Sequence, residues 1–500
     1  MSFDAPTLDW AGLSPLIALA VGLLVVVVAA LFGPLKRLAP ALTVASMAIA
    51  AGLLIWQWDA DLDLAAGSLA LDGLSITFSL LILLAGVVTV LLASGDIAGR
   101  QVGQPDFLAL LLSSVFGMVL LTMANDLVTF FLALEFFSIP LYVLCGTDLR
   151  RRDSLEAGLK YLIIGSIGSA TLLFGLAMLY GGSGGELGFS EIAQGLTKGG
   201  VLDDSLVLFG VGMVVVGLAF KISIAPFHQW TPDVYQGAPT PVTAFMSGAT
   251  KLAAFAVFAR FFLVGLEPLA DQWDVILAIL ATISIVVGNV GALAQSSLKR
   301  LLGYSGIAQA GYMLAGLVVA NRAGLDALGF YLAVYLFMNL AAFSALIIHQ
   351  RTVGSDAIDS LRGVGRSTPA VAWPLTIAMI GMAGLPPTAG FLGKIFLIEA
   401  LVDSGWTWLA VMIVVGTMVS LAYYLRVVIV AWSDSPATSS GSADGPGVDG
   451  ELVEAAGPRA ARRWQFLIPA VLASFATVFF GVIPDPLYEF VSQAGTAIFG

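Results

Sequence analysis

Charged residues are scarce in this sequence, and their scarcity excludes most soluble folds. Lysine, arginine, aspartate and glutamate make up 11% of the 500 residues, against 59% hydrophobic residues, whereas soluble domains carry about 25% charged residues. Apolar runs of about 20 residues recur along the chain and indicate transmembrane helices. The ~10-residue alternating segments of a membrane β-barrel are missing. The composition therefore predicts an all-α polytopic membrane protein.

Other absences limit the chemistry of the chain. The single cysteine, Cys145, excludes an intramolecular disulfide and a cysteine-ligated iron–sulfur or zinc site. There is no P-loop of the form GxxxxGK[ST] and hence no sign of ATP as the energy source. No soluble segment is long enough for a nucleotide or flavin domain. We therefore expect no metal, no cofactor and no nucleic-acid partner in this chain.

Fourteen membrane spans are expected. The N-terminus lacks the basic region of a cleaved signal peptide, so the first span is expected to be retained. Two spans, at 205–235 and 370–402, are interrupted by prolines and glycines. The spans are expected at 14–32, 38–58, 72–94, 107–123, 126–146, 157–180, 205–235, 240–263, 273–294, 301–320, 325–348, 370–402, 407–432 and 464–490.

The spacing of these spans predicts an internal repeat. Spans 4–8 and spans 9–13 begin at matching intervals of about 165–175 residues, and an odd number of helices makes the second unit inverted. The two interrupted spans, the seventh and the twelfth, occupy matching places. The predicted regions are three N-terminal helices (1–106), a first five-helix repeat (107–265), an inverted second repeat (266–433), a flexible cytoplasmic loop (434–463) and a last helix (464–500).

The distribution of basic residues predicts the orientation. Successive loops between spans lie on opposite sides of the membrane. Of the 22 lysines and arginines, fourteen fall in loops on one side, two in loops on the other side and six within spans. Because positive charge accumulates in cytoplasmic loops, we expect Arg150–Arg152 in the cytoplasm and both termini outside.

The two interrupted spans combine helix breakers with ionisable groups. In the first, Pro226 and Pro232 are the expected break and His228 is a candidate relay, with a structural role equally favoured. In the second, Pro386 and Pro387 form the expected break. Paired broken helices in inverted repeats point to an ion or substrate pathway, because the freed carbonyls and the water around them can conduct protons.

Four ionisable residues lie deep within the spans. Glu135, Lys221, Lys251 and Lys394 each cost about 2.5–3.5 kcal/mol at the bilayer centre, so such residues usually face a polar interior and a partner. Burial disfavours a charged amine and a nearby carboxylate favours it. Glu135 opposite Lys221 is therefore predicted to act as a proton switch, Lys251 to pass the proton onward and Lys394 to gate the far side.

Four further polar residues have simpler expected roles. Lys160 follows Glu156 by four residues, and a surface pair and a relay role are equally favoured. Arg260 is expected to extend to the membrane surface and His349 to be solvated. Asp126 is expected to cap a helix.

Three segments carry a resemblance to a known family. FKISIAPFHQWTPDVYQGAPTPVTAFMSGATKLAAF, LKRLLGYSGIAQAGYMLAG and AGLPPTAGFLGKIFLIEAL resemble the antiporter-like subunits of bacterial proton-pumping NADH–quinone oxidoreductase, respiratory complex I. The motifs TPDVYQGAP and PPTAGFLGK favour the subunit N branch of this family. Subunit M typically has glutamate at the place of Lys394, and subunit L is longer. Gln309 departs from the histidine that relatives often have.

The resemblance implies a function and a set of residues. It assigns the relay to Glu135, Lys160, Lys221, Lys251 and Lys394, and implies a proton-translocating subunit in the bacterial cytoplasmic membrane. The expected partners are other membrane-arm subunits, including sister antiporter-like subunits, the lipid bilayer, and protons with water. NADH, flavin, iron–sulfur clusters and quinone are expected in other subunits. The alternatives are a subunit of a multi-subunit cation/proton antiporter and a purely structural arm subunit.

Overall fold

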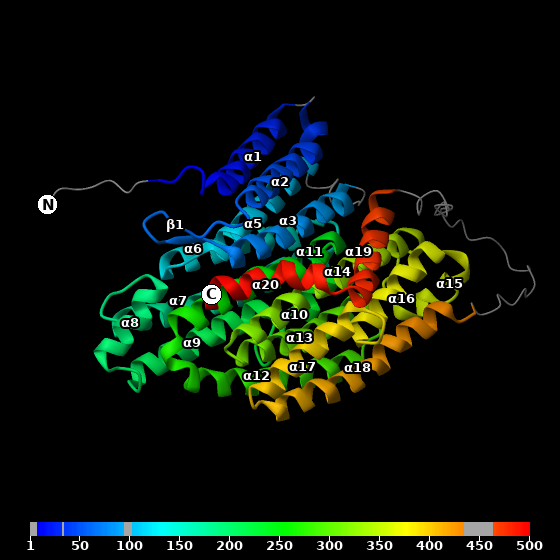
Figure 1. Cartoon of the computed structure of the whole chain (residues 1–500). Coiled ribbons are helices and arrows are strands. Elements are labelled where there is room, and N and C mark those ends of the chain that lie inside the picture. The colour runs from blue at the N-terminus through cyan, green and yellow to red at the C-terminus, as the bar shows by residue number, and fades with distance from the viewer. Residues whose placement is uncertain (1–7, 33–34, 95–102, 435–463) are drawn as a thin grey trace, which may run out of the picture.

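The protein is a bundle of long apolar helices (Figure 1). The computed structural model describes residues 8–32, 35–94, 103–434 and 464–500. The helices outside the two broken spans are α1 (Ser14–Leu31), α2 (Ala39–Trp56), α3 (Gly73–Ser94), α5 (Gln104–Met123), α6 (Leu127–Cys145), α7 (Arg152–Gly182), α8 (Phe189–Gly199), α11 (Thr240–Arg260), α12 (Ala270–Leu293), α13 (Leu298–Val318), α14 (Arg322–Val353), α15 (Val364–Ser367), α18 (Thr407–Trp432), α19 (Trp464–Val482) and α20 (Asp485–Phe499).

Both predicted helix breaks are present. The first span is divided into α9 (Ser205–Ile222) and α10 (Trp230–Gly237), and the second into α16 (Pro369–Ala383) and α17 (Ala389–Asp403). Short helical turns complete the chain: η1 (Leu35–Leu38), η2 (Phe261–Gly265), η3 (Glu267–Leu269) and η4 (Ile358–Leu361).

The membrane class of the sequence is confirmed. Within the described residues, thirteen helices are long and apolar enough to cross a membrane. The remaining predicted span, 370–402, consists of the two 15-residue helices α16 and α17. The predicted loop 434–463 lies, apart from its first residue, outside the described residues.

Three helices form the centre of the bundle. The most apolar window of α11 is completely buried, and those of α13 and α14 are 94% buried, whereas α1, α2 and α19 are at most 33% buried. The peripheral helices therefore present apolar side chains to lipid, as a membrane protein requires. The centre, in contrast, must satisfy its polar groups internally.

Side chains cap four of the described helices, and three of these caps share one geometry. Asp126, Ser297 and Asn321 each accept a hydrogen bond from a backbone N–H three residues on, at 2.6, 3.3 and 3.0 Å respectively. Such caps satisfy donors that the first turn of a helix leaves free. The predicted capping role of Asp126 is confirmed.

Three elements were not predicted from the sequence. A hairpin of β1 (Leu62–Leu64) and β2 (Leu69–Leu71) joins α2 to α3 with Leu62 opposite Leu71. The amphipathic α8 lies between α7 and α9. The predicted last span, 464–490, ends earlier, at Val482, and after Pro484 the chain continues as α20, which packs on α14 and α3 (Figure 1).

Candidate functional site

Lys221 lies in the last turn of α9, immediately before the first break. Ser223, with φ of 65°, ends the helix, and the chain runs irregularly to Gln229. The Lys221 ammonium, only 4% exposed, donates to the Ser138 hydroxyl at 2.6 Å and to the Tyr142 hydroxyl at 3.4 Å, both on α6. It also lies 5.2 Å from the Phe137 ring centre. Hydroxyls and a ring thus replace water around the charge.

Glu135 reaches the same site through hydroxyl groups. Its carboxylate accepts a hydrogen bond from the Ser169 hydroxyl on α7, and the Tyr142 hydroxyl lies near the hydroxyls of Ser138 and Ser169. Among the described residues no ion pair joins Glu135 directly to Lys221, and the proton switch between them stays a prediction. Side-chain hydroxyls, which both donate and accept, connect the two groups instead.

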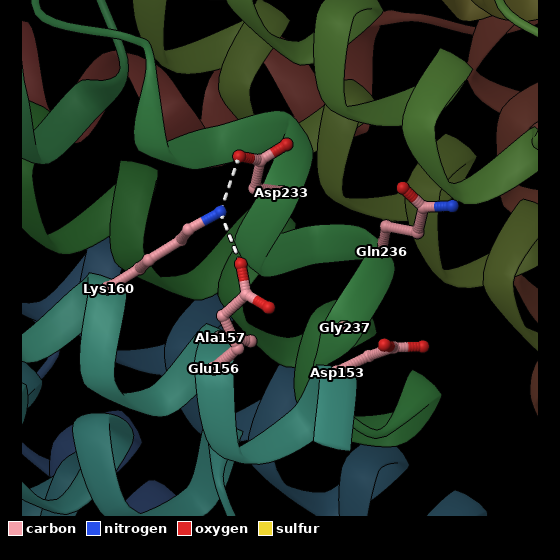
Figure 2. Close-up of a pocket in the computed structure, with 7 residues that line it drawn as sticks. All are labelled: Asp153, Glu156, Ala157, Lys160, Asp233, Gln236 and Gly237. Atoms are coloured by element: carbon pink, nitrogen blue, oxygen red, sulfur yellow. Dashed lines mark hydrogen bonds and ion pairs between the residues drawn. The ribbon is translucent and has the colours of Figure 1, made fainter. Parts of the chain in front are cut away.

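Lys160 lies in a charged cleft of about 210 Å³ between α7 and α10 (Figure 2). Its ammonium pairs with Glu156 at 2.7 Å and with Asp233 at 3.0 Å. The predicted i,i+4 pair with Glu156 is therefore present. Asp233, which was not a candidate in the sequence, adds a partner from the second half of the broken span.

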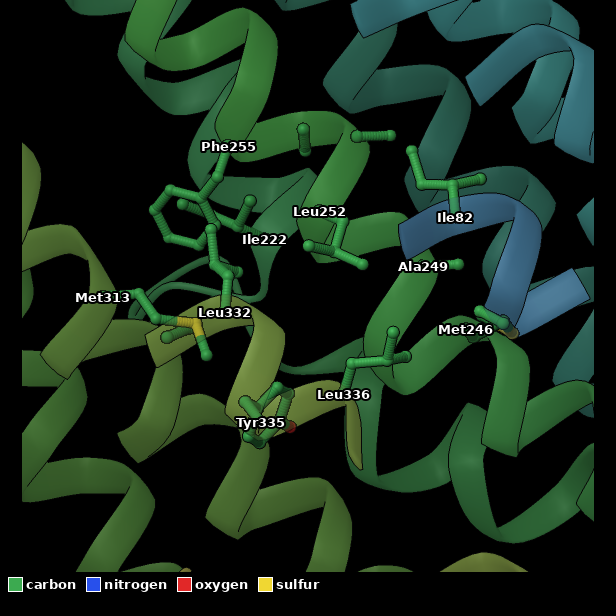
Figure 3. Close-up of a cluster of buried hydrophobic side chains, with 14 of the residues drawn as sticks. Ile82, Ile222, Met246, Ala249, Leu252, Phe255, Met313, Leu332, Tyr335 and Leu336 are labelled. Carbon is green, nitrogen blue, oxygen red and sulfur yellow. The ribbon is translucent and has the colours of Figure 1, made fainter. Parts of the chain in front are cut away.

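Lys251 has the weakest hydrogen bonding of the four lysines among the relay candidates. It is 1% exposed on the fully buried α11, and Leu252 and Phe255 of the same helix belong to a cluster of buried hydrophobic side chains (Figure 3). Its nearest acceptor is the Ile222 carbonyl at 3.5 Å, at the end of α9. A helix C-terminus attracts positive charge, so the first break supplies a weak site for the Lys251 ammonium.

The second break supplies a similar site for Lys394. Its ammonium, 3% exposed, donates to the carbonyls of Met382 at 3.1 Å and Ala383 at 3.4 Å, at the end of α16. It also lies 5.0 Å from the Tyr312 ring centre. Both breaks therefore direct a helix C-terminus toward a buried lysine, as the dipole of each half-helix favours.

Gln309 on α13 lies beside the Lys394 site. Its amide donates to the Met382 carbonyl and to the Tyr424 hydroxyl, both at 3.2 Å, and accepts a hydrogen bond from Tyr331. Gln309 thus shares an acceptor with Lys394. Tyr335, one turn along α14 from Tyr331, has a buried hydroxyl with no hydrogen-bond partner within the described residues.

The remaining sequence candidates have varied positions. Pro226, Pro386 and Pro387 lie in the breaks, whereas Pro232 lies in the first turn of α10, where proline is tolerated. His228 is half-buried in the first break, and its Nδ1 has no hydrogen-bond partner in the described part of the chain.

Two expectations about polar residues are wrong. Arg260 does not extend to the surface: it is 4% exposed and forms a two-pronged pair with Asp72 at 2.7 and 2.8 Å. His349 is not solvated: it is 2% exposed and bonds to the Ser360 hydroxyl at 2.8 Å. Asp72 immediately precedes α3 and Ser360 lies in η4, and the hydropathy pattern does not predict that either residue meets its partner.

The match to a family model covers more than half of the chain. Residues 124–420 match the family described as NADH:quinone oxidoreductase/Mrp antiporter, TM. The chain belongs to this oxidoreductase/antiporter family. All five relay candidates, Glu135, Lys160, Lys221, Lys251 and Lys394, lie within the matched residues.

Relatives within the oxidoreductase/antiporter family are similar over most of their length. NAD(P)H-quinone oxidoreductase subunit 2 of Synechocystis is 42% identical over 409 residues, 81% of this chain and 78% of that protein. NADH-quinone oxidoreductase subunit N 1 of Herpetosiphon aurantiacus is 38% identical over 445 residues, 88% and 90% of the two chains. A chain of respiratory complex I from Thermus thermophilus is 33% identical, with a TM-score of 0.74 over 95% of this chain and 98% of that one.

Proposed function

We propose that this chain is a membrane-arm subunit of an NADH–quinone oxidoreductase that translocates protons through Glu135, Lys160, Lys221, Lys251 and Lys394. The observation that carries this proposal is the placement of Lys251 and Lys394, each buried and each directed at carbonyls freed by a helix break. A buried amine with so few partners is costly to keep charged and is suited to accepting and releasing a proton.

The polar groups give the proposed route an order. A proton is exchanged between Glu135 and Lys221 through the hydroxyls of α6 and α7, and passes to Lys251 at the end of α9. It continues past Gln309 to Lys394. Water completes the gaps between these groups, and His228 is an auxiliary proton acceptor in the first break.

Repeated geometry supports the proposed pair of five-helix units. The Gly117 Cα lies so close to α6 that an added Cβ would be 2.5 Å from the Phe137 nitrogen, and at Gly288 it would be 2.4 Å from the Ala308 nitrogen. Both members of the second pair lie 171 positions after those of the first. The caps Asp126 and Ser297 have the same separation. Inversion of the second unit follows from its odd number of helices.

The relatives favour an oxidoreductase over a cation/proton antiporter. The family model includes both, but the relatives described above at 42% and 38% identity are quinone oxidoreductase subunits. We therefore place the redox cofactors and quinone in other subunits. Sister membrane-arm subunits and lipid contact this chain, in a bacterial cytoplasmic membrane with Arg150–Arg152 on the cytoplasmic side.

Replacing Lys221 by alanine in the intact complex tests the proposal. A group that transfers protons contributes roughly 10²–10⁴-fold to the rate, so we expect Lys221→Ala to reduce proton uptake by reconstituted vesicles at least about tenfold. The matched control is Lys198→Ala, because Lys198 is exposed and its bond within the described residues is to Gln194 on the same helix, α8. Assembly is checked by native gel. Full pumping by an assembled Lys221→Ala complex would refute the proposed relay. The alternative of a purely structural membrane-arm subunit would then remain.

A further inference from the structure

Asp233 joins two helices that are far apart in the sequence. Its two carboxylate oxygens have separate partners: one accepts from Lys160 on α7 at 3.0 Å, and the other from Arg300 on α13 at 2.7 Å. Figure 2 shows the Asp233 and Lys160 side chains directed toward each other across the cleft. One carboxylate therefore bridges the first predicted repeat and the second.

The helix that carries Asp233 fits tightly between these neighbours. A Cβ added at Gly237 would lie 2.4 Å from the Asp153 carbonyl on α7, and one added at Gly303 on α13 would lie 3.3 Å from Pro232. The Ala238 carbonyl, after the end of α10, accepts from Lys299 at 2.6 Å. A small shift of α10 toward α7 would therefore change its contacts with α13, and a shift toward α13 would change its contacts with α7.

A shift of α10 would also reach Lys221. Trp230, the first residue of α10, donates to the Phe220 carbonyl at 3.2 Å and stacks on Tyr161 with ring centres 4.6 Å apart. Tyr161 follows Lys160 in the chain and lies edge-on to Tyr142 at 4.7 Å. The Tyr142 hydroxyl is the second partner of Lys221. A continuous set of packed rings thus connects the Asp233 helix with the first break.

We propose that Asp233 is a positioning residue, whose carboxylate, shared by Lys160 and Arg300, makes the position of α10 depend on the charge of Lys160. This inference rests on the proposed function, because Lys160 must gain and lose a proton. With Lys160 charged, α10 is held from both sides. When Lys160 is neutral, Arg300 alone holds Asp233, and α10 relaxes toward α13 and alters the surroundings of Lys221.

The strength of these pairs fits a switch better than a structural support. The side chains of Lys160, Asp233 and Arg300 are 40%, 37% and 32% exposed, and ion pairs of this exposure stabilise a fold only weakly. Glu156, at 2.7 Å, also faces Lys160, and Asp153 lines the same cleft. A weak pair can be broken and remade in each cycle, because a change of charge on one partner is enough to shift the equilibrium.

Asp233→Asn in the intact complex tests the proposal. The amide is close to isosteric with the carboxylate but removes the charge that Lys160 and Arg300 share. We expect proton uptake per quinone reduced to fall about threefold to tenfold, a smaller loss than the roughly 10²–10⁴-fold contribution of a group that itself transfers the proton. The matched control is Asp153→Asn, the same change in the same cleft, because Asp153 pairs with Arg151 at 3.6 Å. That control should pump normally.

Two further variants distinguish positioning from general stability. Asp233→Glu restores the charge and should recover most of the pumping, which a purely steric defect would not allow. Adding Arg300→Gln to Asp233→Asn should cause little further loss, because the two residues share one interaction. Normal pumping by Asp233→Asn, while Lys221→Ala fails, would overturn the switch and leave the relay intact. Normal pumping by both variants would overturn the proposed function itself.

Discussion

A buried lysine lies near each helix break, but the surroundings of the two lysines differ in chemistry. Near the first break, Lys221 has hydroxyl partners that lead to the carboxylate of Glu135. Near the second, the contacts of Lys394 are two carbonyls and an aromatic ring. At the first site a carboxylate, Glu135, lies within reach of the Lys221 ammonium through hydroxyl groups. At the second site the Lys394 ammonium is contacted by the dipoles of backbone carbonyls. Under the proposed function, this difference favours switching at the first break and relay at the second.

The same contrast extends to the supporting residues. The first half of the bundle contains the buried ion pair of Asp72 and Arg260 and the shared carboxylate Asp233. The second half contains neutral networks. Gln309 bonds to Tyr331 and Tyr424, and Asn289 bonds to Tyr312 at 3.1 Å and Tyr423 at 2.9 Å. Removing a charge should therefore have the larger effect in the first half.

The largest effect on stability is expected for Arg260→Met. The Asp72 carboxylate would lose both hydrogen bonds from Arg260 and remain buried, which typically costs about 3–5 kcal/mol. In thermal unfolding of the detergent-solubilised complex, this subunit should unfold at a clearly lower temperature than in the native protein. The exposed Arg362→Met, which breaks a surface pair with Asp359, is the control. Equal stability of the two variants would show that the first half does not depend on buried charge.

The contribution of this pair should also depend on pH. Burial raises the pKa of the Asp72 carboxyl, but the charge and hydrogen bonds of Arg260, together with those of Ser75, outweigh burial and lower the pKa below its usual range. The stabilisation is therefore complete above the unfolded pKa of about 3.9 and is lost as the pH falls through the folded pKa. The stability difference between the native protein and Asp72→Asn should shrink only in strong acid. A constant difference would contradict the ion pair.

A smaller effect is expected in the neutral half for Gln309→Leu. This change leaves the Tyr331 hydroxyl and the Met382 carbonyl without their amide partner, and an unsatisfied buried group costs about 1–3 kcal/mol. Pumping should fall because the link toward Lys394 is lost. Gln309→His keeps a donor and an acceptor and should retain most of the pumping. If the leucine variant pumps as well as the histidine variant, the route does not pass through residue 309.

The smallest effect is expected for Gly306→Ala. An added Cβ would lie 3.1 Å from the Tyr335 hydroxyl and 3.8 Å from the Lys251 ammonium. One methyl in such a space costs about 1 kcal/mol and should slow pumping without preventing assembly. Gly212→Ala, where nothing lies within 4 Å of the added Cβ, is the matched control. A rate equal to that of the control would show that pumping does not depend on the space between Tyr335 and Lys251.

The sequence predicts the scaffold of this molecule better than the contacts within its site. Apolar runs and prolines are local signals, so the spans and both breaks could be located from them. The partners of Lys221 and Glu135 could not, because Ser138, Tyr142 and Ser169 are ordinary residues of apolar helices. Asp72 and Arg260 are 188 positions apart, and only the packing of α3 against α11 brings them together. The amphipathic helices α8 and α20 were not predicted, because their alternating polar and apolar residues do not form a long apolar run.

In the proposed route Lys251 follows the first break and precedes Lys394, so its replacement tests the central claim most directly. The measurement is the initial rate of proton uptake per quinone reduced, in vesicles containing the assembled complex with Lys251→Ala and, in parallel, with Lys198→Ala. Loss of the transferring amine at the end of α9 should lower this ratio at least about tenfold, while the control remains unchanged. An unchanged ratio in Lys251→Ala would contradict a proton route through the buried lysines.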